Sequence, residues 1–222
     1  MAATDVSEPA LTTAPAPVHR QRLAAGAGVV AVALTAAVIG ALALPDLPGT
    51  TAGSMTHYME LLATNQPWNL LMFMAVPVVL AETVAITELM ILVNRATGAG
   101  VRMFNRWAGL IGGLYFVGVF GYLLVHAVIP LSADGGWRGP ADVIAVGAYL
   151  AGVVPLFGIA LLELGVIGGD RDRAGWLRLH AALVGAFLVV AHIAMIVGML
   201  DPTVLGWGSG ASHGGGHGGM PM

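Results

Sequence analysis

Long apolar runs separated by short polar stretches dominate the chain. Each run holds the roughly 20 residues that a helix needs to cross about 30 Å of hydrocarbon. The runs are uninterrupted, so they do not show the apolar–polar alternation of barrel strands, and a helix pairs its own backbone groups in lipid. The pattern therefore predicts transmembrane helices at residues 23–44, 68–93, 107–131, 143–167 and 177–200.

A shorter stretch with mixed polar and apolar positions precedes the second run. Residues 54–64 include Met55-Thr56-His57-Tyr58-Met59-Glu60, and Asn65-Gln66-Pro67-Trp68 follows as a stop with an aromatic anchor. We expect a short interfacial helix on the outer surface. Short loops join successive runs, so neighbouring helices should pack antiparallel, and Gly113 and Gly118 suggest a close helix contact. The expected fold is an all-α integral membrane protein, an antiparallel bundle of four or five transmembrane helices.

The two ends of the chain have different compositions. Residues 1–18 are rich in Ala, Thr and Pro and are expected to be disordered, whereas residues 201–222 form a flexible tail of Gly, His and Met. The first run, 23–44, has two interpretations. Its basic flank and the sequence Ala41-Leu42-Ala43 also fit a cleaved signal peptide, although the run is long for one, which favours a retained helix.

Composition supports the membrane assignment. Apolar residues make up 57% of the chain and charged residues 9%, against about 25% charged in soluble domains. The net charge of −3 and the absence of a long basic stretch argue against nucleic-acid binding. The chain has no cysteine, which excludes disulfides and thiolate metal sites.

The arginines predict the orientation. Eight of the nine basic residues fall before the first run or in the second-to-third and fourth-to-fifth loops, and only Arg138 lies elsewhere. The positive-inside rule makes that side cytoplasmic, so the N-terminus is expected inside and the C-terminus outside. All basic residues are Arg and the chain is rich in Ala, Gly and Val, which indicates a bacterial protein of the inner (cell) membrane, with multiple passes.

Ionisable residues inside apolar runs are the first functional candidates, because lipid exposure of a charge is costly. Three of them lie toward the cytoplasmic side: Glu88, Glu163 and His180. Solvation or pairing with a nearby Arg would explain why Glu163 and His180 are tolerated there. Another group is expected in the outer half of the bundle, with two of its members on the interfacial helix. It comprises His57, Glu60, Glu82, His126 and His192.

Soft ligands accompany this outer group. Met195 and Met199 share a helical stripe with His192, and the tail carries His213, His217, Met220 and Met222. Thioether and imidazole suit Cu(I), and imidazole with carboxylate suits iron, zinc or Cu(II). Methionine stripes more often fill core space, and intramembrane histidines often bond a neighbouring helix, so packing remains the competing interpretation.

The stretch "MTHYMELLATNQPWNLLMFMAVPVVLAETVAITELMILVN", from Met55 to Asn94, resembles a family of small bacterial multi-span membrane proteins of unknown function. The similarity includes His57, Glu60, Pro77, Glu82 and Glu88, and it fades in the later helices. Such proteins are often labelled as permeases on hydropathy, so the resemblance implies a membrane protein without implying an activity.

Three functions follow from these residues. The first is transition-metal handling, most consistent with copper, in which the tail captures the ion and the outer group binds it or passes it on as a permease. The second is a haem b electron-transfer subunit with His126 and His192 as axial ligands. The third is an assembly or scaffold subunit that works with a partner membrane protein. No known catalytic motif is present, although a membrane metalloenzyme that uses the same ligands stays open.

Overall fold

A computed structural model describes residues 17–45, 55–94 and 96–205. Over these residues the chain is helical and contains no strand. Five helical segments are long and apolar enough to cross a membrane, which confirms the predicted class of fold. They span Arg20–Ala43, Trp68–Val93, Ala99–Ala133, Pro140–Glu163 and Arg173–Gly198.

Several of these spans are built from more than one helical element. The elements in chain order are α1 (Pro17–Ala43), α2 (His57–Ala63), α3 (Trp68–Leu70), η1 (Leu71–Ala75), α4 (Val76–Val93), α5 (Ala99–Leu123), η2 (Leu124–Val128), α6 (Ile129–Ala133), α7 (Pro140–Ala151), α8 (Val153–Glu163), α9 (Arg173–Gly198) and η3 (Pro202–Leu205).

Two prolines explain why two spans change their helical geometry. Pro77 and Pro130 each follow a five-residue π-helical turn, η1 and η2 respectively. Proline lacks the N–H for an intrahelical bond, and its ring crowds the carbonyl four residues earlier, so the turn before it widens. Behind Pro77, the carbonyl of Phe73 accepts a hydrogen bond from the Tyr149 hydroxyl instead.

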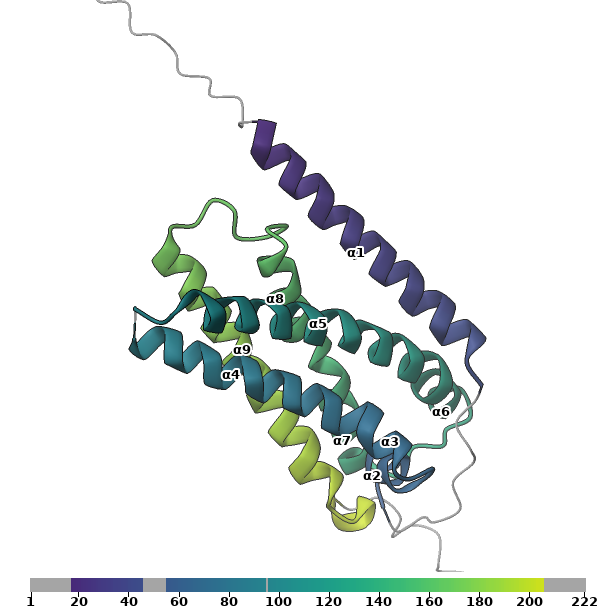
Figure 1. The fold of residues 1–222 in the computed structure, drawn as a ribbon. Coiled ribbons are helices and arrows are strands. Elements are labelled where there is room, and N and C mark those ends of the chain that lie inside the picture. Colours follow the sequence, from purple (N-terminus) through teal and green to yellow (C-terminus); the bar gives the residue numbers. More distant parts are fainter. Residues whose placement is uncertain (1–16, 46–54, 95, 206–222) are drawn as a thin grey trace, which may run out of the picture.

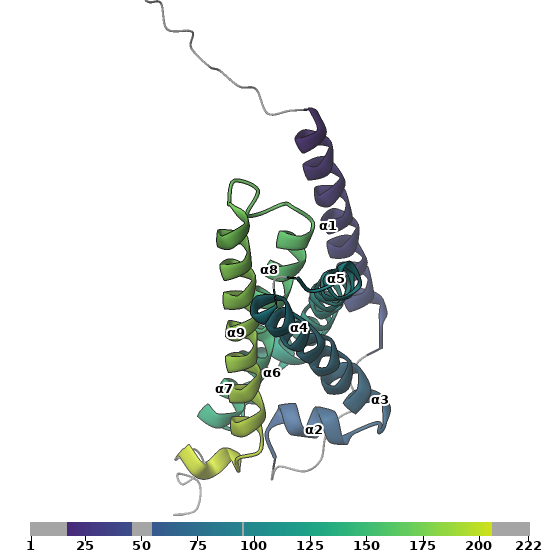
Figure 2. The ribbon, with the colours of Figure 1, turned by 60° about the vertical axis from the view of Figure 1, so that its left-hand side comes forward.

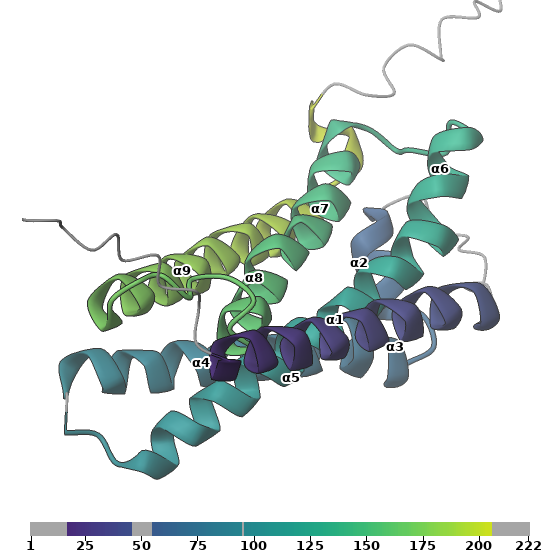
Figure 3. The same ribbon diagram turned by 90° about the horizontal axis from the view of Figure 1, so that it is seen from above.

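Helix α5 is the centre of the bundle. It packs against α1, α4 and α8, while α9 packs against α7, α8 and α4 on the other side. Figure 1 shows α1 on the outside of the bundle, and Figure 3 shows it running alongside α5. The short helix α2 lies at the end of the bundle where α9 finishes (Figure 2).

Helix α2 closes this end, which we call the α2 end, through its apolar side and its N-cap. Tyr58, Leu61 and Leu62 are buried, and the Thr56 side chain accepts from the Met59 N–H as an N-cap. The Thr56 hydroxyl also donates to the Gly198 carbonyl at the end of α9, at 2.6 Å. The predicted short helix is therefore present, and its apolar side is docked onto the end of the bundle.

Glycine permits the closest helix contact. A Cβ at Gly113 would collide with the backbone carbonyl of Leu156 on α8, and one at Gly109 would lie 2.7 Å from the Ile159 side chain. The predicted close approach is thus correct for Gly113. It is wrong for Gly118, where a Cβ would meet nothing within 4 Å, because that position faces away from α8.

These two glycines form a matched pair for a stability test. Gly113→Ala forces α5 away from the α8 backbone and should lower the free energy of unfolding by about 1–3 kcal/mol. Gly118→Ala occupies open space within a helix and should be neutral or stabilising by about 0.5–1 kcal/mol. Thermal unfolding in detergent measures both, and equal effects would contradict the assigned α5–α8 contact.

Candidate functional site

The most buried ionisable cluster joins three spans at the end of the bundle opposite α2. His180 on α9 lies between Glu88 on α4 and Glu163 on α8, and we call these three residues the inner triad. The Nδ1 atom of His180 is 3.0 Å from Glu88 Oε2, and its Nε2 atom is 3.4 Å from Glu163 Oε1. The three side chains are 0%, 4% and 8% exposed, so the contact is made almost entirely out of solvent.

The protonation of the inner triad follows from its composition. A neutral imidazole carries one N–H and one lone pair, and a lone pair facing a carboxylate oxygen is repelled. With a carboxylate at each nitrogen, the triad is favourable only with an imidazolium or a protonated carboxyl. Beyond these contacts within the triad, the buried polar side-chain atoms of Glu88 and His180 have no further hydrogen-bond partner among the described residues. The triad therefore holds at least one exchangeable proton.

Side chains from α5 and from the end of the bundle contact the inner triad. Arg106 lies 3.7 Å from Glu163, and the Trp176 ring stacks on His180 with centroids 5.0 Å apart. A cavity of about 670 Å³ between α1, α5 and α8 is lined by Glu163, Arg106, Trp176 and Arg22. Since Arg106 and Arg22 lie near it, we call this end the arginine end and the cavity the inner cavity.

A second polar network lies beside the triad. The buried Asn105 side chain on α5 donates to the Thr87 hydroxyl at 2.7 Å and to the Val84 carbonyl at 3.2 Å. Thr87 precedes Glu88 on α4, so these bonds fix the α4–α5 contact at the level of the triad.

At the α2 end, two ion pairs hold the short helix in place. Asp142, which is fully buried in the first turn of α7, accepts the backbone N–H of His57 at 2.6 Å and lies 2.5 Å from His57 Nδ1. Glu60 forms an ion pair with Arg138, whose side chain also donates to the Met55 carbonyl. We call Asp142, His57, Arg138 and Glu60 the outer clip.

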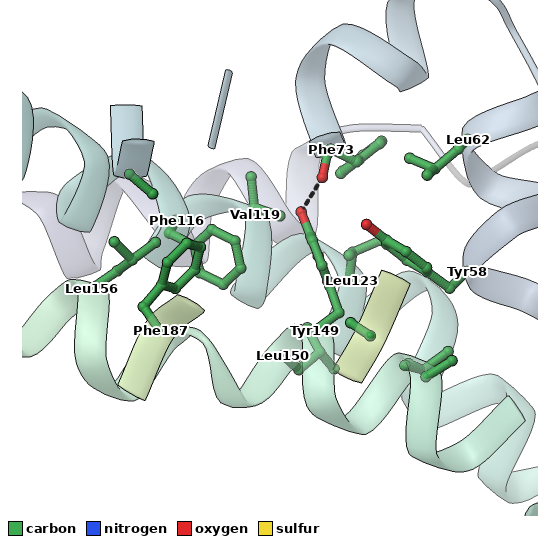
Figure 4. Close-up of a cluster of buried hydrophobic side chains, with 14 of the residues drawn as sticks. Tyr58, Leu62, Phe73, Phe116, Val119, Leu123, Tyr149, Leu150, Leu156 and Phe187 are labelled. Carbon is green, nitrogen blue, oxygen red and sulfur yellow. Dashed lines mark hydrogen bonds between the residues drawn. The ribbon is translucent and has the colours of Figure 1, made fainter. Parts of the chain in front are cut away.

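A small cavity, which we call the groove, opens between α4 and α9. It lies near the outer clip but is separate from it. This groove has a volume of about 80 Å³, and its lining includes Glu82, His192 and Met195 together with Tyr58 and Tyr149. The buried hydroxyl of Tyr149 donates to Phe73, and Figure 4 shows this bond among the packed aromatic rings. Burial raises the pKa of Tyr58 to about 12, so its phenol stays neutral.

The sequence-predicted outer group is only partly brought together. Glu82, His192 and Met195 line one groove, whereas Met199 is exposed beyond it. His126 turns toward α1, where its Nε2 lies 2.5 Å from the Ala41 carbonyl. Within the described residues no group of three or more His, Asp and Glu side chains is arranged to hold a metal ion. The tail residues His213, His217, Met220 and Met222 lie outside the described residues.

Two features differ from the sequence-based interpretation. Solvation or pairing with Arg was expected for Glu163 and His180; Glu163 does pair with Arg106, but His180 is fully buried between two carboxylates. His57 and Glu60 were expected to belong to the outer group, but they pair with Asp142 and Arg138 instead. Asp142 was missed because it falls one residue before the predicted run at 143–167; its place in a helical first turn was the available signal.

Comparison with known proteins gives one match. The model of a family described as "Family of unknown function (DUF6803)" covers residues 53–214. The match includes the inner triad, the outer clip and the residues of the groove. No curated protein and no solved structure matches the chain.

The outer clip can be tested through Asp142. Asp142→Ala leaves His57 and the two backbone N–H donors of His57 and Arg138 without their acceptor, and should cost about 3 kcal/mol or more. Hydrogen exchange of α2 should then rise selectively. Asp134→Ala, at an exposed position, is the control and should leave that exchange unchanged; unchanged exchange in Asp142→Ala would contradict the clip.

Proposed function

The chain belongs to the family of unknown function DUF6803, and since that description names no activity, we propose from the geometry that the protein is a proton-linked permease. The observation that carries this proposal is the inner triad, an imidazole between two carboxylates inside the membrane-spanning bundle. Intramembrane ionisable groups of this kind serve proton relays in pumps and transporters.

The triad can link proton binding to helix movement because its members stand on different spans. An imidazolium attracts both carboxylates, so it draws α4, α8 and α9 together. Protonation of Glu163 removes one attraction and also weakens the pairing with Arg106 on α5. In a low dielectric such a change of charge is worth far more than in water. One proton therefore alters the packing of four helices at the arginine end.

Cavities near both ends suit a permease. The groove reaches Glu82 from the α2 side, and the inner cavity reaches Glu163 from the arginine end. Glu82 and Glu88 are six residues apart on α4, about 9 Å along its axis. The buried side chains of Val84, Phe116 and Leu156 belong to the apolar core of the bundle. By the positive-inside rule the groove faces outward and the inner cavity faces the cytoplasm.

Transition-metal handling is the second candidate, favoured by one observation. Glu82, His192 and Met195 line the same groove, and together they offer carboxylate, imidazole and thioether donors. This set suits copper, with the metal as cargo. His126 turns toward α1 and contributes to neither this set nor the groove lining.

Cysteine accessibility tests the permease, because the chain has no native cysteine. Ala191→Cys places a thiol in the groove and Ala25→Cys places one in the inner cavity. Acidification should raise labelling of Ala25→Cys by a membrane-impermeant reagent and lower labelling of Ala191→Cys, since protonation of Glu163 weakens its attraction to His180 and Arg106 at the arginine end. Adding His180→Gln should abolish both changes.

The control is Ala133→Cys, at the exposed end of α6, whose labelling should follow only the intrinsic reactivity of the thiol. The labelling rates of Ala25→Cys and Ala191→Cys are divided by the rate of this control at each pH. Labelling of Ala25→Cys and Ala191→Cys that is independent of pH, or that changes in the same direction at both, would refute the proton-linked permease.

Metal handling is tested by elemental analysis and an optical spectrum of protein purified in detergent. Stoichiometric copper should survive truncation after Gly206 and disappear in His192→Ala, whereas His126→Ala should retain it because that residue faces α1. A Soret band that needs both histidines would instead favour the haem b subunit. Protein without metal in all forms would remove the copper candidate.

A further inference from the structure

Aromatic rings form a continuous row along the groove. Tyr58 and Tyr149 have ring centroids 4.8 Å apart, Tyr149 and Phe116 5.2 Å, and Phe116 and Phe187 6.2 Å. Figure 4 shows these four side chains in one packed cluster, supplied by α2, α7, α5 and α9. All four line the groove. Aromatic rings present a negative face, and several rings around one space attract a cation.

The charges of the lining have one sign. Glu82 is its single carboxylate, and among the described residues that line the groove there is no Arg. Glu82 is exposed on α4 within a membrane span, where a carboxylate needs a proton or a cation as a partner. Since burial keeps the Tyr58 phenol neutral, Glu82 is the group that gives the groove its charge.

The polar atoms of the groove also favour a cation over an anion. The Tyr149 hydroxyl is used in its bond to the Phe73 carbonyl. His192 Nδ1 lies 2.6 Å from the Leu188 carbonyl, which only accepts, so this nitrogen carries the N–H. In the neutral ring, Nε2 then offers a lone pair. The groove lining therefore combines aromatic side chains, a carboxylate and an acceptor nitrogen.

We propose that the groove binds a small organic ammonium ion, held by Glu82 and by the aromatic row of Tyr58, Tyr149, Phe116 and Phe187. This inference rests on the proposed permease, for which it names the class of solute. The volume of about 80 Å³ limits the bound part to a compact head such as a methylated ammonium. The aromatic rings beside one carboxylate are the surroundings that an organic ammonium ion prefers, and phenylalanine rings supply no ligand to a metal ion.

Calorimetric titration of the detergent-purified full chain with choline tests the inference. Binding should be weakened at least tenfold by Glu82→Gln, which removes the charge at an exposed position, and severalfold by Phe187→Leu, which removes one π-face. The uncharged isostere 3,3-dimethylbutan-1-ol should not bind measurably. Circular dichroism of each variant checks that the helices are intact.

Copper(I) is titrated in parallel with His192→Ala and Met195→Leu. Choline binding that depends on Glu82 and Phe187 supports the organic cation. Absence of choline binding, equal binding of the isostere, or copper binding that needs His192 and Met195 without any choline binding overturns it. These outcomes are distinct from failure of the permease, which is read from the pH dependence of cysteine labelling and needs no ligand.

Discussion

The cost of holding charge inside hydrocarbon governs this structure. Glu88, His180 and Glu163 would each be unfavourable alone at their depth, and they are tolerated because they meet. Their meeting requires α4, α8 and α9 to approach at one level, and Arg106 brings α5 to the same place. Removing one member leaves an unpaired buried charge, so the inner triad fixes the register of the spans that carry it.

The two ends of the bundle use charge differently. At the α2 end, the outer clip satisfies Asp142 with three donors and pairs Glu60 with Arg138, which locks a short helix over the spans. At the arginine end, an imidazole lies between two buried carboxylates, so the attraction between the helices that carry them depends on protonation. The triad is therefore the part of the bundle best suited to change.

Sequence pattern was sufficient for the class of fold but not for the pairing of polar groups. The length and composition of the apolar runs predicted four or five spanning helices, because hydrocarbon thickness sets that length, and the structure has five candidate spans. The break at Gly152 between α7 and α8 was not predicted, nor was the open space at Gly118.

Depth along a helix placed Glu163 and His180 near one end of the bundle. Which helix faces meet there depends on packing that a single sequence does not encode. The same limit explains why Asp142 was missed and why His126 and His192 received similar roles although they face different surroundings.

Proton exchange at the inner triad underlies the proposed function, and Trp176 can report it directly because its ring stacks on His180 at an interplanar angle of 22°. A chain with Trp68, Trp107, Trp137 and Trp207 replaced by Phe keeps this single tryptophan. Its emission should follow one titration step as pH varies, since an imidazolium quenches a stacked indole more strongly than a neutral ring. The step should shift in Glu88→Gln, which removes a negative neighbour of His180, and stay in place in Glu82→Gln. Emission that is independent of pH, or a step that persists in His180→Gln, would contradict proton exchange at the triad.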